Sequence, residues 1–308
     1  MSAKKVLYVS PVPQHSNPAL DAIASSLQST FDESQLDMRV VFGDFRHGPQ
    51  SQSLPGQIES AVAAGVAAIL IYMVDPEAGR REVFAARKAG IPVFTIARPR
   101  YPVNASLSHP GFNQGVFMMD FLTSQLPEGA GVGIIGGPQA LTDLEEVAGM
   151  RFSLQRSHCR LLNDPEQPEY ANTTDDRAGG RVAARALIER LPEAQGLAPY
   201  NDETMLGLLD HLEEIDRVGQ LRIVSRNGSP AAVKAVREGR TTGTWDLDAP
   251  GIGRHTAELV IRHLQQRQNY EDHAAMLPAG RMITRDNVDS WVPWEERVRQ
   301  QPLRIGLE

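Results

Sequence analysis

Polar residues recur directly after apolar runs along the chain, and their side chains are the ones most able to do chemistry. Seven of them form the candidate ligand-binding set: Ser16, Asn17, Arg98, Asp175, Asn201, Asn227 and Asp246. Amides both donate and accept hydrogen bonds, carboxylates accept them, and a guanidinium donates two in one plane. No nucleophile–base pair accompanies the set, so we expect binding of a polyhydroxyl ligand and no enzymatic reaction.

The pair Asn201-Asp202 separates the apolar run GLAPY from an amphipathic helical pattern that extends to Leu212. Asp202 is a good N-cap residue for that helix. We therefore assign the helix cap to Asp202 and ligand binding to Asn201. This division predicts that Asn201→Ala loses ligand binding while the fold survives, whereas Asp202→Ala costs about 1 kcal/mol of stability.

Apolar runs and helical patterns alternate along the chain. KVLYVS (5–10), MRVVFG (38–43), AAILIYM (67–73) and IPVFTIA (91–97) are separated by helical patterns, which predicts a parallel sheet with helices on both faces. The alternation then restarts, with GVGIIGG (131–137) as the next strand. The sequence therefore predicts an α/β fold of two similar doubly wound parallel-sheet lobes. Ligands of such sheets bind beyond the carboxyl ends of the strands, where the candidate set accumulates.

Composition excludes several classes of protein. A length of 308 residues suggests about two domains, and a formal net charge of −7 opposes nucleic-acid binding. The longest apolar runs are too short to span a bilayer. The single cysteine, Cys159, excludes an intrachain disulfide, and the eight histidines show no HxxxH or HxH spacing. We expect neither a metal nor a cofactor.

The one literal nucleotide-binding motif lies in an unsuitable place. Gly131–Gly136 spells GxGxxG, but these glycines fall inside an apolar strand run and not at a turn that opens a helix. The motifs GxxxxGK[ST], GxSxG and HExxH do not occur. A nucleotide-dependent oxidoreductase is therefore a weak alternative.

Four segments of the sequence resemble those of a known family: ARKAGIPVFTIAR (86–98), LAPYNDETMLGLLDHL (197–212), IVSRNGSPAAVKAVREGRTTGT (223–244) and MITRDNVD (282–289). With them, the chain resembles the type I periplasmic sugar-binding proteins, the ribose-binding-like family that also supplies the effector domains of LacI-type repressors. The resemblance implies a monomeric periplasmic solute-binding protein that closes on a carbohydrate or polyol. It also implies docking on the membrane permease of an ABC transporter.

The resemblance also implies the division of the chain and the roles of single residues. One lobe would comprise 1–106 plus 247–282 and the other 107–246 plus 283–308, with three crossings and a ligand cleft between the lobes. Asn201 and Arg98 match ligand-binding positions of the family. Asn227 stands where an aspartate is usual, and Asp175 stands where a stacking aromatic is common. Ser16 and Asn17 fall on polar positions of the first loop.

Departures from the family pattern suggest a particular ligand. Ala97 replaces an aspartate, Ala19-Leu20 replace an aromatic pair, and Ala148 stands where an arginine is expected. Most of the aromatic platform for a flat pyranose is therefore missing, so our hypothesis is a pentose, a furanose or a linear polyol. Whether the ligand is neutral or acidic stays open, because Ala97 removes a negative charge while Asp175 would repel an anion.

The second alternative is the effector-sensing domain of a cytosolic LacI-type regulator. No helix-turn-helix precedes KKVLYVS, so this function would require a truncated chain. The first residues also lack the apolar region and cleavage site of a signal peptide. For a periplasmic protein we therefore expect that the leader has been removed.

Overall fold

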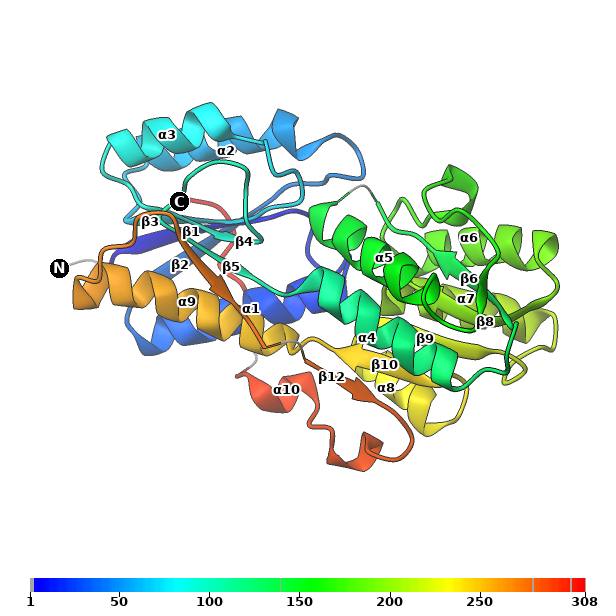
Figure 1. Ribbon diagram of the computed structural model, residues 1–308. Helices are drawn as coiled ribbons and strands as arrows, with labels where there is room; N and C mark the ends of the chain where they lie inside the picture. The colour runs from blue at the N-terminus through cyan, green and yellow to red at the C-terminus, as the bar shows by residue number, and fades with distance from the viewer. Residues whose placement is uncertain (1–2, 139, 279, 300, 308) are drawn as a thin grey trace. The chain divides into compact units, whose positions relative to one another are not determined.

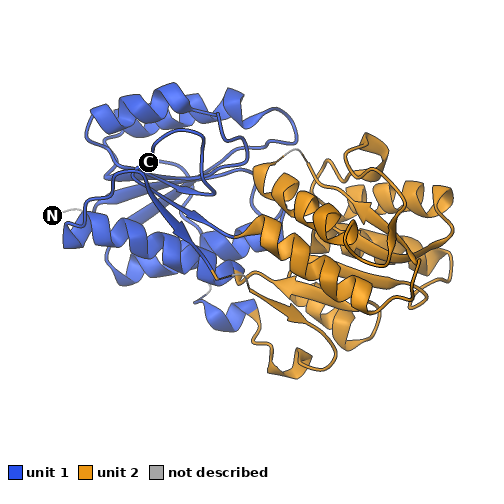
Figure 2. Cartoon of the chain, in the orientation of Figure 1, with its two compact units in different colours: residues 1–109, 249–277, 294–308 blue, residues 110–248, 278–293 orange. Residues whose placement is uncertain are grey.

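The computed structural model describes residues 3–138, 140–278, 280–299 and 301–307. The chain forms two compact units (Figure 2): unit 1 consists of Met1–His109, Ala249–Leu277 and Trp294–Glu308, and unit 2 of Pro110–Asp248 and Pro278–Pro293. Each unit contains one six-stranded sheet covered by helices (Figure 1). The expected α/β fold of two doubly wound lobes is confirmed.

The chain passes between the two units four times, not three, because the segment from Trp294 onward belongs to unit 1. This segment contacts the edge strand of the unit 1 sheet, where Ile305 forms a parallel bridge with Val40. Arg304 forms ion pairs with Asp32 and Asp37. Residues 278–282 belong to unit 2, opposite to the expected division. The expected lobe boundaries are therefore wrong at the C-terminal end, since these contacts join residues far apart in sequence.

The sheet of unit 1 is parallel throughout, in the order β11-β5-β4-β3-β1-β2. Helices α1 and α9 pack against each other, as do α2 and α3 (Figure 1). The strands are β1 (Lys5–Ser10), β2 (Asp37–Phe42), β3 (Ala68–Tyr72), β4 (Val93–Ile96), β5 (Ala105–Ser108) and β11 (His273–Met276). The helices are α1 (Pro18–Glu33), α2 (Gln50–Ala63), α3 (Arg80–Lys88), α9 (Ala249–Gln266) and α10 (Trp294–Arg297).

The sheet of unit 2 has the order β12-β10-β9-β8-β6-β7, and only its edge strand β12 runs antiparallel to its neighbour within the described residues. The strands are β6 (Gly131–Ile135), β7 (Arg160–Leu161), β8 (Ala194–Pro199), β9 (Arg222–Asn227), β10 (Gly243–Asp246) and β12 (Arg281–Ile283). The helices are α4 (Gly111–Ser124), α5 (Leu141–Leu154), α6 (Arg177–Arg190), α7 (Asp202–Glu214) and α8 (Pro230–Arg237), with short 3₁₀ turns η1 (Pro168–Tyr170) and η2 (Val288–Ser290).

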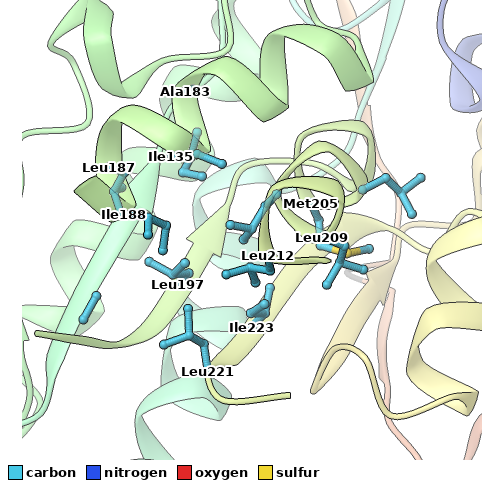
Figure 3. Close-up of a cluster of buried hydrophobic side chains, with 14 of the residues drawn as sticks. Ile135, Ala183, Leu187, Ile188, Leu197, Met205, Leu209, Leu212, Leu221 and Ile223 are labelled. Carbon is cyan, nitrogen blue, oxygen red and sulfur yellow. The ribbon is translucent and has the colours of Figure 1, made fainter. Parts of the chain in front are cut away.

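A buried apolar cluster holds α6 and α7 against this sheet. Figure 3 shows Ile135, Leu197 and Ile223, from β6, β8 and β9, together with apolar side chains of the two helices such as Leu187 and Leu209. The helical period of the apolar residues between Met205 and Leu212, predicted from sequence, is the period of this buried face. The cluster packs β8 and β9 against these helices, and so helps to position the polar residues at and after the strand ends.

Gly131 and Gly133 of the glycine-rich motif lie inside strand β6, as predicted, and Gly136 directly follows the end of the strand at Ile135. Helix α5 begins only at Leu141, so the glycines do not open a helix. A Cβ atom at Gly133 would lie 3.0 Å from the side chain of Leu197, which indicates a packing role for this glycine. In the described part of the chain, no helix has both the length and the apolar character that a bilayer crossing requires.

Candidate functional site

An arginine and two carboxylates form a buried cluster at the carboxyl edge of the unit 2 sheet. Arg226 lies near the end of β9 and is 5% exposed. Its guanidinium lies 3.1 Å from Asp143, between Nη2 and Oδ1, and 2.7 Å from Glu146, between Nη1 and Oε2. The two acids are three residues apart on α5, so they project from one face of the helix. We call these three residues the Arg226 cluster.

Burial perturbs both acids of the Arg226 cluster. Loss of hydration raises the pKa of Asp143 to about 7 and that of Glu146 to about 8, although the charge of Arg226 opposes both shifts. The charge of Asp175 contributes to the raised pKa of Asp143. One guanidinium therefore does not fully compensate the negative charge around it.

A second hydrogen-bonded group follows strand β8. The Asp175 Oδ1 atom accepts a hydrogen bond from the Tyr200 hydroxyl and another, 2.7 Å long, from Asn201 Nδ2. All three side chains are buried. Burial, and then the charge of Asp175, raises the pKa of Tyr200. The sequence placed Asp175 and Asn201 in the candidate set, and the structure brings them into direct contact.

The roles expected for Asn201 and Asp202 are reversed in part. Asn201 is the N-cap of α7, and its Oδ1 accepts a 2.9 Å hydrogen bond from the backbone N–H of Thr204. The expectation that Asp202 caps the helix is therefore wrong. Residue propensities could not separate two adjacent good caps, and the distant partners of Asp202, not its place in the chain, decide its role.

Asp202 is fully buried and links four elements. Its carboxylate accepts hydrogen bonds of 2.6 Å from the hydroxyls of Ser225 on β9 and Thr244 on β10. It also accepts a 2.7 Å bond from the backbone N–H of Ser229, the N-cap of α8. Burial raises the pKa of Asp202 to about 6, although these hydrogen bonds oppose the shift. Asp202 therefore holds α7 to its neighbours.

Asn227 and Asp246 end adjacent strands and lie opposite each other in the sheet register. Asn227 has a φ of 133°, an unusual value for a residue other than glycine. Asp246 accepts 2.9 Å hydrogen bonds from the Trp291 indole N–H and from the backbone N–H of Asp248. Both side chains are buried. The structure thus brings four of the sequence-predicted residues to one edge of unit 2: Asp175, Asn201, Asn227 and Asp246.

The remaining candidates lie in unit 1, after strands β1 and β4. Asn17 is the N-cap of α1 and accepts a 3.0 Å hydrogen bond from the backbone N–H of Ala19. Ser16, directly before it, is partly exposed. Arg98 has a side chain that is 47% exposed and pairs with Asp272 at 3.0 Å. A role for these residues toward a ligand stays a prediction.

The Arg226 cluster was not predicted from the sequence. The i, i+3 spacing of Asp143 and Glu146 was the only local signal, and acidic residues in the first turns of a helix are ordinary. Among the described residues, no group of three or more histidine, cysteine, aspartate or glutamate side chains is arranged to hold a metal ion.

Solved structures of other proteins share this architecture. A solved galactofuranose-binding protein shares the fold with a TM-score of 0.82 and 15% identity, over 93% of this chain and 96% of its own. So does the periplasmic binding protein component of the arabinose ABC transporter from Shewanella sp. ANA-3, bound to α- and β-L-arabinofuranose, with a TM-score of 0.82, 16% identity and 95% of both chains covered.

A relative in sequence is the ribose import binding protein RbsB of Bacillus subtilis (strain 168). It is 23% identical over 227 residues, which cover 72% of this chain and 70% of the relative. The family model described as "Periplasmic binding protein domain" matches residues 12–268. The chain therefore belongs to the periplasmic binding protein domain family.

Proposed function

We propose that this protein is a periplasmic substrate-binding protein that captures a small, hydroxyl-rich sugar or polyol for an ABC importer. The observation that carries the proposal is the buried polar edge of unit 2, which combines Asp175, Asn201 and the Arg226 cluster. Membership of the periplasmic binding protein domain family supports a binding role. The membrane permease of the importer is the proposed macromolecular partner, and the protein acts as a monomer.

The chemistry of this edge suits hydroxyl groups. A sugar hydroxyl both donates and accepts, so it pairs with carboxylates on one side and with amide or guanidinium N–H groups on the other. Burial strengthens such hydrogen bonds by lowering the local dielectric. The candidate residues supply acceptors and donors side by side, which is what capture without chemical conversion requires.

The size of the proposed ligand is that of a pentose, a furanose or a linear polyol. The chain has Ala19-Leu20 where an aromatic pair is expected, so a flat pyranose would find little to stack on. The proteins compared above are named for ribose, galactofuranose and arabinofuranose, which supports the same size class.

The proposal is tested by a thermal-shift screen against pentoses, hexoses, linear polyols and NAD(P), followed by calorimetry on each hit. A ligand at about a hundred times its dissociation constant stabilises the folded state by about 2.7 kcal/mol and moves Tm by several degrees. One sugar or polyol should give this shift. A response to a dinucleotide alone would contradict the proposal and favour the oxidoreductase alternative.

Asn201→Ala should abolish the calorimetric signal, while circular dichroism still shows a folded protein. The matched control is Asp176→Ala, which removes the N-cap of α6, where the Asp176 side chain accepts from the N–H of Gly179. Both variants lose a cap worth about 1 kcal/mol. Equal loss of binding in the two would show that cap loss, not a ligand contact, explains the effect of Asn201→Ala.

A further inference from the structure

When its acids are ionised, which their raised pKa values place at about pH 8 and above, the polar edge of unit 2 carries more negative than positive charge. Asp143, Glu146 and Asp175 supply three negative charges when ionised and Arg226 supplies one positive charge, a formal sum of −2. Asp202 adds to the negative field at Glu146. The guanidinium is already engaged by two carboxylates, which opposes its use as an anchor for an anionic ligand.

Glu146 also lacks a hydrogen-bond donor. Its side chain is 0% exposed, and Oε2 forms the ion pair with Arg226. Among the described residues, nothing donates a hydrogen bond to the Oε1 atom of the same carboxyl group. Buried carboxylate oxygens almost always have a donor, because losing water without a replacement is costly. The site therefore lacks a donor at this point, and a ligand could supply it.

The raised pKa values of the two acids agree with the shortage of positive charge around them. Both acids of the Arg226 cluster have raised pKa values, with burial as the main cause. A positive charge placed within about 4–6 Å of a carboxylate favours its ionised form by one to three pKa units. By linkage, the carboxylates stabilise that positive charge by the same factor.

We propose that Glu146 and Asp143 make this site select ligands by charge. This inference rests on the proposed function. A sugar analogue with a protonated amine binds more tightly than the neutral sugar of the same shape, and the neutral sugar binds more tightly than the corresponding acid. The amine supplies both the missing positive charge and the donor that Glu146 Oε1 lacks. An acidic sugar would instead meet a surplus of carboxylates.

The test uses matched ligands that differ mainly in charge. One trio is D-ribose, its pyrrolidine iminosugar analogue and D-riburonate, and the other is D-galactose, D-galactosamine and D-galacturonate, whose acids keep the sugar ring. Calorimetry at about pH 8, where both acids of the Arg226 cluster are at least about half ionised, and at low salt should give a cation at least about tenfold tighter than the neutral member, with the acid weakest. Neutral sugar binding with no gain from the amine would overturn the charge selection and leave the proposed function intact. Silence from both trios and from every sugar and polyol of the thermal-shift screen would overturn both.

Glu146→Gln assigns the effect to the cluster, since it removes an acid that a bound cation would hold in its ionised form and keeps the shape of the side chain. The preference for the cation over the neutral ligand should fall by about tenfold, with the affinity for the neutral ligand changed less. Glu145→Gln, the same substitution at the exposed neighbour, should leave the preference unchanged. Asp143→Asn provides the same test if Glu146→Gln fails to fold. An unchanged preference in the folded variant would overturn the assignment.

Discussion

Asp202 illustrates how a single buried carboxylate can organise a sheet edge. Hydroxyl and N–H donors from β9, β10 and the start of α8 all converge on its two oxygens. A donor that loses its acceptor inside the protein bears the full cost of its lost hydration. Stability at this position therefore depends on several donors at once, which makes Asp202 more important to folding than a helix cap.

Asp202→Ala should lower the free energy of unfolding by about 3 kcal/mol or more, because it leaves buried donors without an acceptor. Urea unfolding followed by tryptophan fluorescence measures the change. Asp289→Ala is the control, since its side chain is 94% exposed and its contact with Arg237 is long, at 3.8 Å. A loss of only about 1 kcal/mol at Asp202, the value for a helix cap, would contradict the structural role assigned here.

Among the elements, α5 matters most to the proposed ligand site, because it carries both acids of the Arg226 cluster. It packs closely on α4 through glycines: a Cβ atom at Gly149 would lie 2.0 Å from the carbonyl oxygen of Phe112, and one at Gly115 would lie 2.1 Å from that of Glu146. Backbone atoms cannot move aside as a flexible side chain can. The two glycines therefore fix the distance of α5 from α4, and with it the position of Glu146.

Gly149→Ala should force the two helices apart and lower the free energy of unfolding by about 3 kcal/mol. Gly56→Ala in α2 is the matched control, because no atom lies within 4 Å of a Cβ there. That change should stabilise the protein by up to about 1 kcal/mol through helix propensity. Thermal and urea unfolding measure both. Equal effects of the two changes would argue against close packing of α4 and α5.

The elements were largely predictable from sequence, whereas their distant partners were not. Alternating apolar runs and helical periods predicted β1 to β4 and β6, and the position of Gly131 and Gly133 inside β6 was predicted from their apolar neighbours, whereas the short strand β5 was not predicted. Asp175 and Asn201 were found because they follow apolar runs. Arg226 was missed because its ion pairs cross 80 or more residues. The segment after Trp294 was misassigned because it has no periodicity of its own.

At the scale of the whole molecule, buried acids make stability depend on pH. Burial raises the pKa to about 7 for Asp143 and Glu203, about 8 for Glu146 and about 6 for Asp202. An unfolded chain has values near 4 for the same groups. Between about pH 4 and 8 the folded state therefore binds more protons than the unfolded state. The free energy of unfolding must then fall as pH rises through this window.

The expected fall is about 1.4 kcal/mol per pH unit for each net proton that the folded state retains. Urea unfolding at about pH 5.5 should show a higher midpoint than at about pH 8.5, with an unchanged denaturant slope. Glu146→Gln removes one of the groups with a raised pKa and should flatten the dependence of stability on pH, whereas the exposed Asp289→Asn should not.

Below about pH 4 the trend reverses, because hydrogen bonds from Arg46 and Arg177 lower the pKa of Asp44 and Asp210, and these pairs are lost on protonation. Stability that rises steadily from about pH 5 to 8 would show that the buried acids of unit 2 are already compensated in the folded protein.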